Sequence, residues 1–134
     1  MTKLIVFRTD RFDVSKESQH PIHPELNPHG EALLLWVRQQ ANEDFHVGEL
    51  EDQEIGWFVL SKWKGKTYSF GCCVSGEDEG DTGMDREWQL QIGKLRSLKE
   101  SILGRGKLDM SDECFSYIYR LIESQPDFRE VTVL

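Results

Sequence analysis

Hydrophobic and polar positions alternate along the middle of the chain. The alternation is cleanest over residues 86–94, and it also describes residues 67–75 and, with more apolar side chains, residues 55–63. A period of two places successive side chains on opposite faces of a strand. Lys64-Gly65-Lys66 lies between two of these segments, and its glycine suits the positive φ of a tight hairpin turn. The pattern predicts three consecutive antiparallel strands with one face solvated.

Shorter segments predict further strands. Lys3 to Phe7 is a short apolar run with β-branched residues, and Phe45 to Leu50 alternates over a few positions. Glu130 to Leu134 reads as a terminal strand, which must join an edge of a sheet or stay loose.

Three segments have the spacing of helices. Residues 30–42 repeat apolar side chains at i, i+3, i+4 and i+7, with Asn27 as the expected N-cap. Residues 96–104 continue a shorter pattern, which two glycines end. Residues 111–124 carry a strong apolar stripe, and Ser111 is the expected N-cap of this helix.

The order of these elements predicts the fold class. Strands in a block followed by helices are typical of α+β folds. We expect a single antiparallel sheet, a meander of about four to six strands, with about three helices packed on one face. The 134 residues suit a single domain, 1–134, in which residues 8–29 lack any period and form an irregular arm containing proline and histidine.

Charge narrows the classes of partner. The formal net charge is −8 and the pI is about 5.0, which argues against nucleic acid and anionic membranes as partners. No apolar run approaches a membrane span or a signal sequence, so we expect an unexported, cytoplasmic protein. Its three cysteines are expected to be reduced, and no cofactor is expected. A basic protein partner remains compatible with this charge.

The stretch GEDEGDTGMD, residues 76–85, has five carboxylates and no cation. Neither possible register matches the ligand pattern of a helix-flanked calcium loop. A solvated connection between strands is the simplest interpretation, and a contact surface for the lysines and arginines of a partner is the functional alternative. Residues 43–54 are also strongly acidic. The candidate partner-binding residues are Glu51, Asp52, Glu54, Trp63, Glu77, Asp78, Glu79, Asp81 and Asp85.

The basic segment and the cysteines are candidates for binding or catalysis, but we expect structural roles for them. The basic segment from Lys94 to Lys107 could bind an anion, but it lacks the spacing of a nucleotide phosphate loop, and we interpret it as a solvated helix face that also pairs with neighbouring carboxylates. The thiols of Cys72, Cys73 and Cys114 are interpreted as structural. No catalytic residue is expected. The alternative function is a small metal-dependent enzyme that uses His20, His23 and nearby carboxylates.

Three stretches carry a resemblance: NPHGEALLLWVRQQ, EDQEIGWFVLSKWKGKTYSFG and EWQLQIGKLRSLKESILGRGKL. Together they resemble a family of small acidic bacterial proteins of unassigned activity, in which an acid-rich segment precedes Gly-Trp at the start of a central hairpin. Such proteins are similar in kind to immunity proteins, which neutralise a toxin by binding it. The resemblance implies a binding role. The acidic charge and the lack of a competent catalytic constellation favour a non-catalytic cytosolic binding module, most concretely an inhibitor or immunity-type protein for a basic protein partner.

Overall fold

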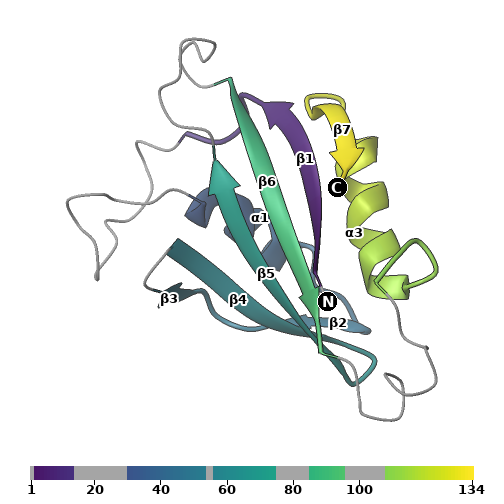
Figure 1. Ribbon diagram of the computed structural model, residues 1–134. Coiled ribbons are helices and arrows are strands. Elements are labelled where there is room, and N and C mark those ends of the chain that lie inside the picture. The colour runs from purple at the N-terminus through teal and green to yellow at the C-terminus, as the bar shows by residue number, and fades with distance from the viewer. Residues whose placement is uncertain (1, 14–29, 54–55, 75–84, 96–107) are drawn as a thin grey trace.

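A computed structural model describes residues 2–13, 30–53, 56–74, 85–95 and 108–134 (Figure 1). Its elements, in chain order, are β1 (Thr2–Thr9), α1 (Glu31–Gln39), β2 (Phe45–Val47), β3 (Glu51–Gln53), β4 (Gly56–Trp63), β5 (Lys66–Val74), β6 (Arg86–Lys94), α3 (Glu113–Ser124) and β7 (Arg129–Val133). The predicted helix at 96–104 lies outside the described residues. No helix in the described ranges is long and apolar enough to cross a bilayer.

The strands form one antiparallel sheet in the order β2-β4-β5-β6-β1-β7. The expected meander is β4-β5-β6, and β3 pairs with the same side of β4 as β2 does. β1 returns beside β6, which leaves β7 to cover the far edge of β1. The terminal segment therefore joins the sheet of its own chain, and the α+β architecture is confirmed.

The expected strand from Phe45 to Leu50 is wrong in its extent. β2 ends at Val47, and the chain resumes pairing with β4 only at Glu51, where β3 begins. Gly48 still donates its backbone N–H to the carbonyl of Leu60 at 2.9 Å, so the chain follows β4 through the break. The expected arm is likewise wrong at its start, because β1 extends through Thr9.

The turn between β4 and β5 has the expected hairpin geometry. Lys64 and Gly65 have φ of 47° and 85°, both in the left-handed region. Two such central residues give a turn whose twist matches that of the flanking strands. Trp63 and Lys66 pair across it.

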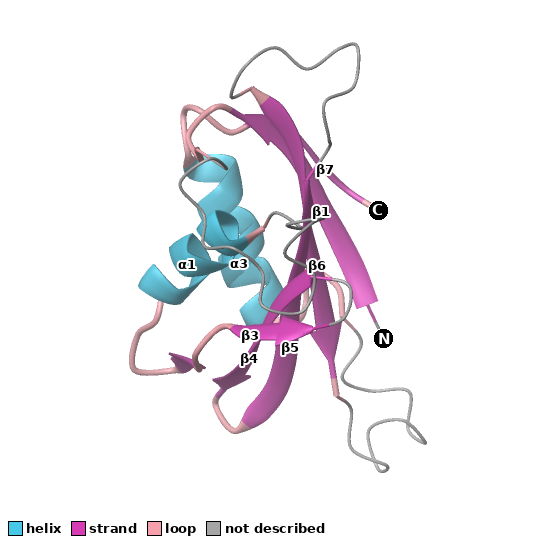
Figure 2. Ribbon diagram, turned by 90° about the vertical axis from the view of Figure 1, so that its left-hand side faces the viewer, coloured by secondary structure: helices cyan, strands magenta, loops and turns pink. Residues whose placement is uncertain are grey.

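Helices α1 and α3 lie on the same side of the sheet (Figure 2). The expected N-caps are both wrong. α1 begins after Gly30, at φ 139°, and a Cβ there would lie 2.9 Å from that of Cys72, so this position requires glycine. α3 is capped by Asp112, whose side chain accepts a hydrogen bond from the backbone N–H of Phe115 at 2.9 Å.

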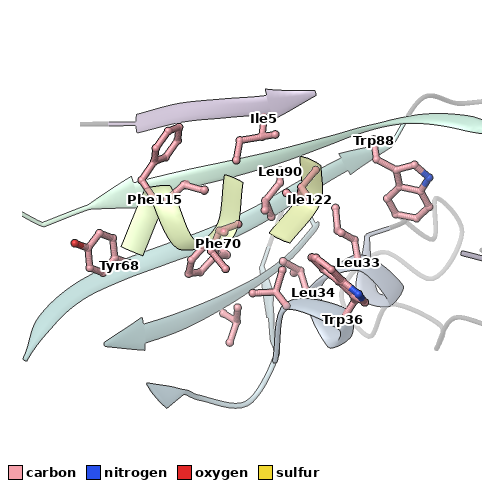
Figure 3. Close-up of a cluster of buried hydrophobic side chains, with 14 of the residues drawn as sticks. Ile5, Leu33, Leu34, Trp36, Tyr68, Phe70, Trp88, Leu90, Phe115 and Ile122 are labelled. Atoms are coloured by element: carbon pink, nitrogen blue, oxygen red, sulfur yellow. The ribbon is translucent and has the colours of Figure 1, made fainter. Parts of the chain in front are cut away.

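The core lies between the helices and the inner face of the sheet (Figure 3). The predicted inward positions of β5 and β6 are buried at Tyr68, Phe70, Trp88, Leu90 and Ile92. The helices contribute a second buried layer: Leu33, Leu34, Trp36, Val37, Cys114, Phe115, Ile118 and Ile122. The alternation in the sequence therefore predicted these inward positions correctly.

Candidate functional site

The sheet has two ends that differ in what they hold. We call one the turn end: it contains the Lys64-Gly65 turn, the last residues of β6 and the start of α3. We call the other the loop end: there β5 stops at Val74, β6 begins at Arg86, and β3 pairs with the first residues of β4.

A buried ion pair lies at the turn end. The Nζ of Lys94 is 2.7 Å from the Oδ2 of Asp112, and both side chains are only 2 % exposed. The hydroxyl of Tyr68 donates to the same oxygen at 2.7 Å, while Oδ1 accepts the N–H of Phe115. Lys94 thus pairs with a carboxylate, as expected, but it is buried, and the prediction that it lies on a solvated face is wrong. A buried charge is tolerable only when it is paired and hydrogen-bonded, and this carboxylate is both.

The adjacent surface is organised by Glu113. Its Oε2 accepts a hydrogen bond from Nε1 of Trp63 at 2.9 Å and pairs with Nζ of Lys64 at 2.9 Å. The bond from Trp63 and the charge of Lys64 lower the pKa of the Glu113 carboxyl, so this group is ionised at neutral pH. Trp63 also packs on the ring of Tyr117 with centroids 5.2 Å apart. A tryptophan that the sequence placed near the surface thus has a fixed position.

A surface cavity of about 470 Å³ opens beside this cluster. Its apolar wall comes from the end of β4, the turn before α3, and α3 itself. Its principal lining residues are Trp63, Met110, Glu113, Tyr117, Arg120 and Leu121. A volume of this size, with mostly apolar walls and a few polar groups, falls in the range of small-molecule sites.

The loop end carries arginine–carboxylate pairs that water still reaches. Asp85 pairs with Arg129 and lies 3.7 Å from the guanidinium of Arg8. Arg11 donates through Nε to Asp127 at 2.7 Å, and this bond lowers the pKa of the Asp127 carboxyl. Asp85, a candidate for partner binding, therefore already has two cations of its own chain beside it.

The remaining candidates are divided between the two ends. The side chain of Glu51 is exposed on β3, and Asp52 pairs with Trp57 in the sheet register. Trp63 is at the turn end, five residues along β4 from the partner of Glu51, which is about 17 Å at the rise of a strand. The other candidates lie outside the described residues: Glu54, Glu77, Asp78, Glu79 and Asp81.

The exposed carboxylates of residues 43–51 follow one edge of the sheet, which we call the acidic edge. It consists of the exposed side chains of Glu43, Asp44, Glu49 and Glu51. The backbone of Asp44 contacts Lys64 at the turn end, and Glu51 lies near the loop end. No strand in the described ranges pairs with the outer side of β2 or β3. The acidic edge therefore links the two ends along an open strand edge.

The structural interpretation of the thiols fits the buried Cys114, whereas the exposed Cys73 fills no space in the core. Burial, followed by the nearby carboxylate of Asp112, raises the pKa of the Cys114 thiol, which opposes formation of the reactive thiolate. Cys73 is exposed on the outer face of β5, and Cys72 is half-buried. His20 and His23 lie outside the described residues. Within the described ranges no three histidine, cysteine or acid side chains gather as a metal site would require.

Comparison with known proteins yields no relative. No protein-family model, no curated protein and no solved structure matches this chain.

Proposed function

We propose that this chain is a non-catalytic cytoplasmic binding module, an inhibitor or immunity-type protein that engages a basic protein partner. The observation that carries the proposal is the acidic edge, four exposed carboxylates along an open edge of the sheet. Opposite charges on a partner would accelerate encounter and fix its orientation.

The packing of the chain supports a binding role. Glu51 lies on β3, and the connections that carry Glu43, Asp44 and Glu49 flank β2, whose Phe45 is anchored in the core. A preorganised surface loses less conformational entropy when a partner binds. The other candidate partner-binding residues of the acid-rich segments, Asp52, Glu54, Glu77, Asp78, Glu79 and Asp81, stay predictions from the sequence.

The test compares two variants that change the net charge equally. One is Glu43→Gln/Glu49→Gln/Glu51→Gln on the acidic edge. The other, Asp10→Asn/Glu123→Gln/Glu130→Gln, changes three exposed carboxylates elsewhere. Immobilised protein captures its partner from a lysate of its own cell, and the purified partner is then measured against both variants.

We expect the edge variant to slow association about tenfold, and the control variant to behave like the unmodified chain. Raising NaCl from about 0.05 to about 0.5 M should remove most of this difference, because salt screens exposed charges. A captured partner that binds both variants equally, or binds without any dependence on salt, would contradict the proposal.

A further inference from the structure

The cavity beside α3 is distinct from the acidic edge and has a different chemistry. Trp63 and Tyr117 form adjoining aromatic walls, and Leu121 and the half-exposed Met110 extend the apolar surface. The indole is fixed by its hydrogen bond to Glu113, and the hydroxyl of Tyr117 donates to the carbonyl of Gln40 at 2.8 Å. Both rings are therefore held in place before any ligand arrives.

The charges around the cavity leave one cation unused. Glu113 is matched by Lys64, as described above. Arg120 also lines the cavity, about two turns along α3 from Glu113; it is exposed and makes no hydrogen bond or ion pair with any residue that the structure describes. A guanidinium presents a planar set of donors that fits a carboxylate at two points.

The geometry points to a binding site for a small aromatic monocarboxylate, whose ring lies against Trp63 and Tyr117 and whose carboxylate pairs with Arg120. A cationic ligand fits less well, although aromatic walls and a nearby acid would attract one. Glu113 already accepts a hydrogen bond from Trp63 and pairs with Lys64, and Arg120 repels the positive charge of such a ligand. A neutral ligand leaves the guanidinium without its complement.

The experiment uses three probes with the same bicyclic body: 2-naphthoate, 2-naphthamide and 2-naphthylmethylammonium. Binding is followed by the NMR resonance of the Trp63 indole N–H, which the Trp63→Phe variant assigns. We expect 2-naphthoate to shift this resonance and to bind about five- to tenfold more tightly than the amide, as a hydrogen-bonded ion pair at a partly exposed site allows. The ammonium probe should bind most weakly.

Two arginine variants make the test specific. Arg120→Gln should bring the affinity for 2-naphthoate down to that for the amide, while its spectrum elsewhere shows that the fold is intact. Arg38→Gln, at another exposed arginine, on α1, should leave all three affinities unchanged. The inference is overturned if none of the probes moves the Trp63 resonance at millimolar concentration. It is also overturned if the amide or the ammonium binds as tightly as the carboxylate, or if Arg120→Gln has no effect. None of these outcomes depends on the acidic edge.

Discussion

The buried ion pair of the turn end and the partly exposed pairs of the loop end hold their charges in opposite surroundings. At the turn end Lys94 and Asp112 are almost fully withdrawn from water. The ammonium of Lys94 and the hydroxyl of Tyr68 both bind the Oδ2 of Asp112. At the loop end Asp85 keeps a third of its side chain exposed between two arginines, one of which is half-exposed. The same type of bond, a cation against a carboxylate, therefore occurs in two different dielectric surroundings.

The fold depends more strongly on each side chain of the buried pair than on any side chain of the exposed pairs. Buried charges gain strongly from each other but have given up their hydration, so neither can be removed alone without a large cost. Exposed pairs exchange readily with water and contribute little each. The carboxylate of Asp112 also caps α3, so it ties the helix to β5 and β6 at one point.

The largest effect is expected for Asp112→Ala. This change leaves the ammonium of Lys94 buried without a partner and removes the cap of α3. We expect it to lower the free energy of unfolding by about 3 to 5 kcal/mol, as measured by chemical denaturation.

Two further variants separate the charge from the cap. Asp112→Asn keeps a capping side chain but not the charge. Its free energy of unfolding should still fall by most of the amount expected for Asp112→Ala. Adding Lys94→Met to Asp112→Asn should restore much of it, because no unpaired buried charge remains. An Asp112→Asn protein as stable as the unmodified chain would show that the ion pair does not support the fold.

Most of the fold could be predicted because the apolar pattern is local. Alternation in residues 67–75 and 86–94 gave the inward faces of β5 and β6, and the i, i+4 stripe gave the buried face of α3. The cap of α1 could not be predicted, because Gly30 is required by a close approach to Cys72, which is 42 residues away in the chain. A contact between residues so far apart in the chain cannot be recognised from the local pattern of either segment.

The buried ion pair left a signal that the charge pattern obscured. Lys94 continues the inward parity of Trp88, Leu90 and Ile92, so its position in the strand pointed to the core. Its neighbours in sequence are basic, which favoured a solvated face. The partner could not be found from spacing, since Asp112 lies on a different element. The cavity beside α3 was equally out of reach, because β4 and α3 meet only in the folded chain.

A smaller effect is expected for Asp85→Asn at the loop end. The pairs with Arg8 and Arg129 are partly exposed, so their loss should cost no more than about 1 kcal/mol at low salt. The measured difference from the unmodified chain should shrink at about 1 M NaCl, where the Debye length is about 3 Å. A loss as large as that of Asp112→Ala, or one that ignores salt, would remove the contrast between the two ends.

The smallest effect concerns the titration of Glu113, which sits at the turn end but on the surface. Its pKa is lowered chiefly by the hydrogen bond from Trp63, then by the bond and charge of Lys64. A carboxyl with a lowered pKa stabilises the fold above its ordinary titration range, and this contribution is lost as the pH falls through the lowered value. Trp63→Phe should therefore raise the pKa of Glu113 toward the ordinary value, and Lys64→Met should raise it as well, because that change removes both a hydrogen bond and a charge. An NMR titration of the side-chain carboxyl carbon in both variants measures the two shifts directly. If Trp63→Phe left the pKa of Glu113 unchanged, the indole bond would not hold Glu113 at the rim of the cavity, and the ring of Trp63 would be less firmly positioned than its contacts imply.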